Sequence, residues 1–105
     1  MKEKGNNSEE YLSLQKVSKD LFHLEMNDDL AYDKQFEAIA KHIEYLIQYD
    51  FNQLLHILYR VDVSEEKIKQ ALSENKNRRS SDVITQLLID REKQKRAFRA
   101  RFSNK

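Results

Sequence analysis

The sequence predicts an all-α fold, a small bundle of four to five helices, and three observations support this prediction. The 105-residue chain contains one glycine, Gly5, and no proline, so the residues preferred in tight hairpin turns are missing from the rest of it. Segments such as EYLIQ and KIKQALSEN are rich in good helix formers. Apolar residues make up 39% and charged residues 35% of the chain, which is compatible with one modest hydrophobic core.

The composition along the chain predicts one domain. Residues 1–8 are polar and are expected to form a disordered N-terminal tail. Residues 9–102 carry the helical patterns and form a single helical domain, and residues 103–105 end the chain. The start of the sequence lacks the apolar core of a signal peptide and no long apolar run follows, so we expect a cytoplasmic protein that does not enter a membrane.

The first predicted helix begins after Ser8. This serine can cap a helix whose first turn carries Glu9 and Glu10, because acidic side chains are favoured near the positive end of the helix dipole. Apolar residues then recur at intervals of three and four, at Leu14, Val17, Leu21 and Leu24. The spacing predicts an amphipathic helix that ends near Met26.

The segment 33–61 is predicted to be a long central helix or a helix pair. One apolar seam runs through it in steps of three and four residues: Phe36, Ala40, Ile43, Ile47, Phe51, Leu54, Leu58 and Val61. A second stripe lies beside the seam and consists of Ala38, His42, Tyr45 and Tyr49. A surface helix normally buries one stripe, so this segment is either the centre of a bundle or has a partner outside the chain.

Whether this segment breaks near Asp50 is open from the sequence. Asp50 followed by Gln53 has the spacing of a capping box, which favours a new helix. The uninterrupted seam, with no glycine or proline, favours a continuous one.

Two further helices are predicted in the second half. Ser64 is a good N-cap for a helix that frays at Asn75. The last helix is predicted from Asp82 to Phe102, long and basic, with an apolar side made of Val83, Ile84, Leu87, Leu88, Phe98 and Phe102.

Charge is distributed unevenly along the chain. Residues 1–75 hold 9 Lys/Arg and 15 Asp/Glu, whereas residues 76–105 hold 10 Lys/Arg and 3 Asp/Glu. This asymmetry is typical of a polyanion-binding tail, but it also suits two parts of one fold that attract each other. An anionic partner would be contacted by cations that we expect to point outward: Lys93, Arg96, Arg99 and Arg101.

Phe98 and Phe102 favour docking of the basic tail within the fold. A solvated basic arm has no need of two phenylalanines in register with the core side of the helix. The expected rim partners are acidic residues of the first half: Glu25, Asp28, Asp29 and Asp33. A projecting arm remains the alternative.

The stretch LLHILYRVDVSEEKIKQAL, residues 54–72, resembles the helix-turn-helix pattern of bacterial DNA-binding proteins. Val63-Ser64 followed by Ile68 matches the turn and an inward-facing residue of the second helix, and the resemblance implies contact with DNA. The sequence departs from the pattern, because Asp62 stands where a turn glycine is usual. The second helix also begins with two glutamates, which carry the wrong charge for contact near phosphates. The other interpretation is a helical corner of a bundle.

Catalytic and metal-binding patterns are scarce. There is no cysteine, and the lack of internal glycine excludes a glycine-rich phosphate loop. Asp20 and His23 share a predicted helix face, but a di-iron bundle needs this motif twice with two further glutamates. We therefore predict no catalytic residues, no metal site and no cofactor.

The sequence thus favours a non-enzymatic helical protein that acts as a homo-oligomeric protein-interaction module. We expect a homodimer in which Ala38, His42, Tyr45 and Tyr49 meet their own copy, and a further protein partner is compatible with this interpretation. The alternative function is a nucleic-acid-associated regulator that uses the basic C-terminal helix or the helix-turn-helix at 54–72.

Overall fold

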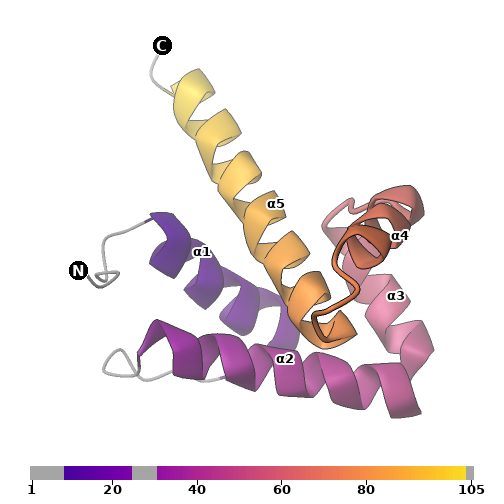
Figure 1. Cartoon of the computed structure of the whole chain (residues 1–105). Coiled ribbons are helices and arrows are strands. Elements are labelled where there is room, and N and C mark those ends of the chain that lie inside the picture. The colour runs from indigo at the N-terminus through magenta and orange to yellow at the C-terminus, as the bar shows by residue number, and fades with distance from the viewer. Residues whose placement is uncertain (1–8, 25–30, 104–105) are drawn as a thin grey trace.

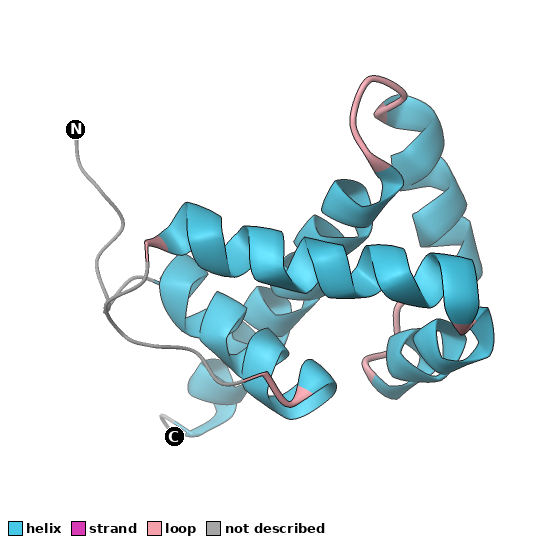
Figure 2. Ribbon diagram, turned by 90° about the horizontal axis from the view of Figure 1, so that it is seen from below, coloured by secondary structure: helices cyan, strands magenta, loops and turns pink. Residues whose placement is uncertain are grey.

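The computed structural model describes residues 9–24 and 31–103, and within these ranges it contains five α-helices, one π-helical turn and no strand. Figure 1 shows α5 as the long axis of the fold, with α1 on one side, α3 and α4 on the other, and α2 across the end where α5 begins. The connections within the described ranges are short (Figure 2). The predicted all-α bundle is confirmed, whereas the disorder predicted for residues 1–8 lies outside the described residues.

The first helix consists of α1 (Glu9–Lys16) and a π-helical turn, η1 (Val17–Leu21). The wide turn places Phe22 in the core, 6% exposed, and His23 then takes a positive φ of 54°. The helix therefore ends before the predicted boundary near Met26. The prediction was wrong because it extended a regular period of three and four, whereas a π turn adds one residue and shifts the buried face.

The central segment forms two helices, α2 (Tyr32–Tyr49) and α3 (Phe51–Arg60), so the open question about Asp50 is answered by a break. Asp50 has φ −154° and ψ 64°, outside the helical region, and its side chain accepts a hydrogen bond of 3.3 Å from the backbone N–H of Gln53. This is the N-cap half of the predicted capping box, because the N–H of Asp50 bonds to the Leu46 carbonyl at 2.9 Å and not to the Gln53 side chain. The predicted apolar seam is interrupted at the break, because Phe51, the first residue of α3, is 52% exposed. The seam residues on either side of it, among them Ile43 and Leu54, pack in the same core.

The turn after α3 depends on Asp62, which has a positive φ of 67°. Its N–H bonds to the Tyr59 carbonyl, and the N–H of Val63 bonds to the Leu58 carbonyl, both at 3.1 Å. These two bonds form a Schellman motif, and the buried side chains of Val63 and Leu58 supply its usual apolar contact. Asp62 occupies the position at which glycine is preferred.

Helix α4 (Glu65–Glu74) is capped by Ser64, whose hydroxyl accepts from the N–H of Lys67 at 3.1 Å. No residue of α4 is fully buried. The helix packs on α5 through partly buried side chains that include Ile68 and Ala71. It is therefore the most lightly packed helix of the described part of the chain.

Helix α5 (Ser80–Ser103) is the longest helix of the described residues. Its 24 residues span about 36 Å at 1.5 Å per residue, and its last turns extend beyond α1 and α4 (Figure 1). Phe98 and Phe102 are each 61% exposed, so the prediction that they pack in the core is wrong. They continue the apolar side of α5, but no described helix reaches far enough to cover them.

One hydrophobic core joins α1, η1, α2, α3 and α5. Its buried members are Leu14, Val17, Phe22, Ile39, Ile43, Leu46, Leu54, Ile57, Leu58, Val63, Ile84, Leu88 and Ile89. In the described residues no helix is both long enough and apolar enough to cross a membrane.

Candidate functional site

The second stripe predicted for α2 lies on its surface and is called here the aromatic stripe: Ala38, His42, Tyr45 and Tyr49. Ala38 is exposed and His42 is partly buried, while Tyr45 is 58% and Tyr49 71% exposed. The structure thus brings all four residues to one face of one helix and leaves the outer part of that face in solvent.

The aromatic rings of this face form a continuous row. Phe22 meets His42 edge to face, with ring centroids 5.2 Å apart. His42 stacks on Tyr45 at 6.5 Å, and Tyr45 contacts Tyr49 at 5.0 Å. Because Phe22 is buried, the row is anchored in the core at one end and exposed at the other. Contacts between neighbouring rings restrict their rotamers before any partner binds.

The core packing of α2 fixes the direction of the stripe. Ile39, Ile43 and Leu46 are buried, and together they hold one side of α2 against the core. Residues 38, 42, 45 and 49 lie on an adjacent arc, which follows from 3.6 residues per turn. The sequence pattern found this arc, but it could not find the contact with Phe22, because the π turn that creates it was not anticipated.

The basic residues of the tail do not all face solvent. Lys93 donates to Glu10 at 2.7 Å, and Arg96 donates to Glu9 at 3.0 Å. Arg99 forms an ion pair of 3.2 Å with Glu92, seven residues earlier in α5. Arg101 is exposed. The expectation that Lys93 and Arg96 point outward is therefore wrong, since both face α1.

The acidic partners of the tail are also different from those expected. Glu25, Asp28 and Asp29 lie outside the described residues, and Asp33 makes no ion pair within them. The partners are instead the first two residues of α1. The sequence contained a signal for this pairing. Lys93 and Arg96 are three residues apart, so they lie on the same side of a helix, where they can pair with the adjacent Glu10 and Glu9.

Glu10 joins three helices. Its carboxylate accepts hydrogen bonds from Lys93, from Tyr32 at 3.2 Å and from Gln86 at 3.4 Å. The hydrogen bond from Lys93 is the main reason that the pKa of Glu10 is lowered, and the same bond raises the pKa of Lys93. Burial, followed by the charge of Glu10, raises the pKa of the Tyr32 hydroxyl. The arrangement ties α1, α2 and α5 together.

The segment that resembles a helix-turn-helix does form two helices and a turn, and Asp62 adopts the conformation that glycine provides elsewhere. Glu65 and Glu66 are exposed at the start of α4, where a recognition helix would approach phosphates. This placement favours the interpretation as a helical corner.

The Asp20–His23 pair is not assembled. Asp20 bonds instead to Lys16, which lowers the pKa of its carboxyl, and His23 lies beyond the helix end. Within residues 9–24 and 31–103, no group of three or more His, Cys, Asp or Glu side chains is placed to hold a metal ion.

Comparisons with protein-family models, with curated proteins and with solved structures gave no match to this chain.

Proposed function

We propose that this protein is a non-enzymatic, cytoplasmic interaction module that forms a homodimer through the aromatic stripe of α2. The observation that carries the proposal is the ordered row of rings that runs from the buried Phe22 to the exposed Tyr49. Tyrosine is enriched among interface anchors because it offers a large apolar ring and a hydroxyl that can stay hydrated.

The stripe is complementary to its own copy when two α2 helices run antiparallel. A two-fold axis that passes between His42 and Tyr45 sets each His42 opposite the Tyr45 of the other copy. The same axis sets the small Ala38 opposite the large Tyr49, since both pairs are centred on the same point of the sequence. Small residues facing large ones allow two helices to interdigitate, and a two-fold arrangement closes without open ends.

Preorganisation supports the same interface. His42 and Tyr45 are stacked, and Tyr45 rests on Tyr49, so little side-chain freedom is lost when the stripe is covered. Lys34 and Lys41 flank the stripe and keep the face hydrated in the free chain. Because the stripe is short, we expect association in the micromolar range, as for small interfaces.

A distance measurement between spin labels tests the orientation. The chain has no cysteine, so Lys34→Cys and Lys41→Cys each give one specific label per chain. In the antiparallel dimer the two copies of residue 34 are about 20 Å farther apart along the helix axis than the two copies of residue 41.

A parallel pair of α2 helices would give similar separations at both positions, and a monomer would give no coupling between labels. Either result would contradict the proposed dimer. Circular dichroism of the labelled variants is the control for folding, and both lysines are exposed, so the labels should not disturb the core.

A further inference from the structure

Helix α5 has two faces with different surroundings. One face binds α1, because Gln86 and Lys93 reach Glu10 and Arg96 reaches Glu9. The other face carries residues that follow one another in steps of three and four: Leu87, Arg91, Gln94, Phe98 and Phe102. This spacing places them on one side of the helix along most of its length.

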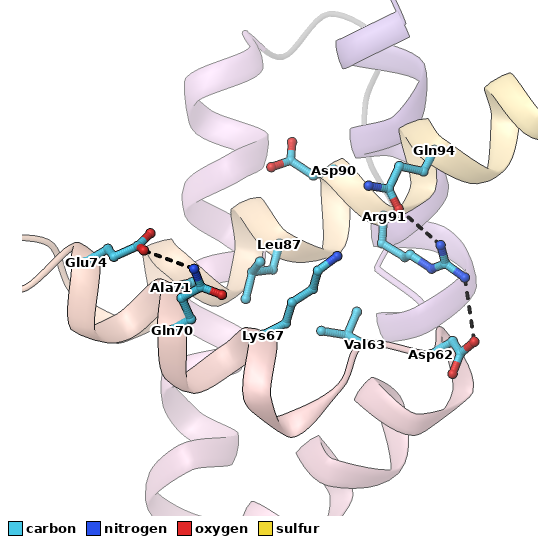
Figure 3. Close-up of a pocket in the computed structure, with 10 residues that line it drawn as sticks. All are labelled: Asp62, Val63, Lys67, Gln70, Ala71, Glu74, Leu87, Asp90, Arg91 and Gln94. Atoms are coloured by element: carbon cyan, nitrogen blue, oxygen red, sulfur yellow. Dashed lines mark hydrogen bonds and ion pairs between the residues drawn. The ribbon is translucent and has the colours of Figure 1, made fainter.

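The first half of this second face lines a groove with α4. The groove has a volume of about 300 Å³ and is drawn in Figure 3. Val63, Ala71 and Leu87 form its apolar part. Charged and amide side chains line the rest: Asp62, Lys67, Gln70, Glu74, Asp90, Arg91 and Gln94. Gln94 is the last residue of α5 at the groove, so α4 covers this face no farther.

Beyond Gln94 the same face is open. The rings of Phe98 and Phe102 lie edge to face with centroids 4.7 Å apart, and each side chain is 61% exposed. In Figure 1 this end of α5 extends away from the other helices. Two contacting rings on a helix form an apolar ridge that is already ordered before binding.

The ridge is bordered by positive charge. Lys95 and Arg99 lie along one edge and Arg101 along the other, at the positions that a helical turn of 3.6 residues gives them. Within the described residues neither Lys95 nor Arg101 makes an ion pair. Aromatic and arginine side chains are the residue types that most often carry binding energy at interfaces.

The geometry points to a docking surface for an acidic amphipathic helix of a partner protein. Its apolar side covers the ridge of Phe98 and Phe102, its carboxylates face Lys95 and Arg101, and one end enters the groove beside α4. Charge complementarity selects this occupant. A second α5 of the same protein would bring Lys95, Arg99 and Arg101 against their own copies.

A polyanion fits the surface less well. The groove that continues the ridge carries three carboxylates, Asp62, Glu74 and Asp90, which repel a phosphate chain or an anionic bilayer lying along the face. Lys93 and Arg96 are already paired with α1 on the opposite side. A peptide helix can present both signs of charge and so can match the ridge and the groove together.

A designed peptide tests this surface. The probe is a fluorescein-labelled helix of about 18 residues, or about 27 Å, with leucine on one side. Its other side carries glutamate where the helix covers the ridge and lysine in the turn that enters the groove. Fluorescence anisotropy at physiological salt measures its binding to the full chain. A peptide with lysine in place of glutamate, a short DNA duplex and vesicles of phosphatidylcholine with phosphatidylglycerol are titrated in parallel.

We expect the glutamate peptide to bind and the lysine peptide not to bind. Phe98→Ala combined with Phe102→Ala should weaken binding of the glutamate peptide by about tenfold or more. The matched control is Tyr59→Ala, which removes another exposed aromatic ring, 64% exposed, on α3 and should leave binding unchanged. All substituted residues are exposed, so circular dichroism should show unchanged folding.

Three results would overturn the assignment. The first is no measurable binding of the glutamate peptide to the full chain. The second is equal loss of binding in the Tyr59→Ala control. The third is tighter binding to the duplex or to the anionic vesicles than to the peptide, because a polyanion would then be the preferred occupant. None of them bears on the dimer through α2, which is measured without the peptide.

Discussion

Lys93 donates a hydrogen bond of 2.7 Å to Glu10, a residue 83 positions earlier in the chain. This contact attaches the middle of α5 to the first turn of α1, and the neighbouring bond from Arg96 to Glu9 extends it. The excess positive charge of the C-terminal region is therefore partly neutralised by the start of the domain.

The Glu10–Lys93 pair predicts a pH dependence of stability. The pKa of Glu10 is lowered on folding, so its contribution is present above the ordinary carboxyl pKa and is lost as the pH falls through the folded value. The pKa of Lys93 is raised, so the contribution is present below the ordinary lysine pKa and is lost as the pH rises through the folded value. Glu10→Gln should lower the free energy of unfolding by about 1 kcal/mol at neutral pH.

Urea unfolding at several pH values checks this expectation. The difference between the wild type and Glu10→Gln should shrink as the pH falls below the carboxyl range. Glu44→Gln is the control, since it removes an exposed carboxylate of α2 and should have little effect. A difference that stays constant down to acidic pH would show that the ion pair is not its cause.

Asp62 offers a stabilising substitution. It holds a positive φ of 67°, a conformation that glycine adopts without steric cost. Asp62→Gly should raise the free energy of unfolding by about 0.5–1 kcal/mol, because the ion pair that it removes, with Arg91 at 3.7 Å, involves a carboxylate that is 86% exposed. Asp62→Ala should lower stability instead. Thermal unfolding of both variants measures this, and a destabilised glycine variant would mean that the Arg91 contact dominates.

Ser13 is predicted to be replaceable by alanine. Its side chain is fully buried, and its hydroxyl has no hydrogen-bond partner among residues 9–24 and 31–103. Ser13→Ala should raise the free energy of unfolding by up to about 1 kcal/mol, since it removes an unsatisfied polar group and improves helix propensity.

The matched control for this substitution is Ser18→Ala. Ser18 is also buried, but its hydroxyl donates to the Leu24 carbonyl at 3.4 Å, so the same change should bring no gain. Chemical unfolding of both variants gives the comparison. A loss of stability in Ser13→Ala would indicate that its hydroxyl is satisfied in solution, for example by a buried water.

Binding to nucleic acid is predicted to be weak. If Lys95 and Arg101 provide the main phosphate contacts, the logarithm of the affinity for duplex DNA should fall with the logarithm of salt with a slope of about −2. Filter binding at several salt concentrations measures the slope, and Lys95→Gln with Arg101→Gln should nearly abolish it. Tight binding with a slope of about −5 or steeper would instead support the nucleic-acid alternative.

Helix positions were predictable where one period continues without interruption. Helix α4 begins where it was expected, because Ser64 is a good cap. Helix α5 begins at Ser80, two residues before the predicted start at Asp82, so the serines ahead of Asp82 lie inside the helix and do not cap it. The predicted boundary near Met26 was wrong, because a π turn changes the period without leaving a signal in residue type.

Of the two candidate surfaces, the aromatic stripe of α2 could be predicted from the sequence and the surface at the end of α5 could not. The aromatic stripe follows from periodicity alone, which assigns residues to a helix face. The exposure of Phe98 and Phe102 could not be predicted, since it depends on where α1 and α4 end relative to α5. The spacing of residues within one helix says nothing about where the neighbouring helices end. The groove beside α4 was missed for the same reason.

The mass of the protein in solution tests the central claim most directly. Light scattering at high micromolar concentration should give twice the mass of one chain for the wild type. Tyr45→Glu combined with Tyr49→Glu should give the mass of a single chain, because four charges would be buried at the interface. Tyr59→Glu, at an exposed position of α3, should leave the dimer intact. A wild-type mass of one chain, or a dimer that survives the double substitution, would contradict assembly through the aromatic stripe.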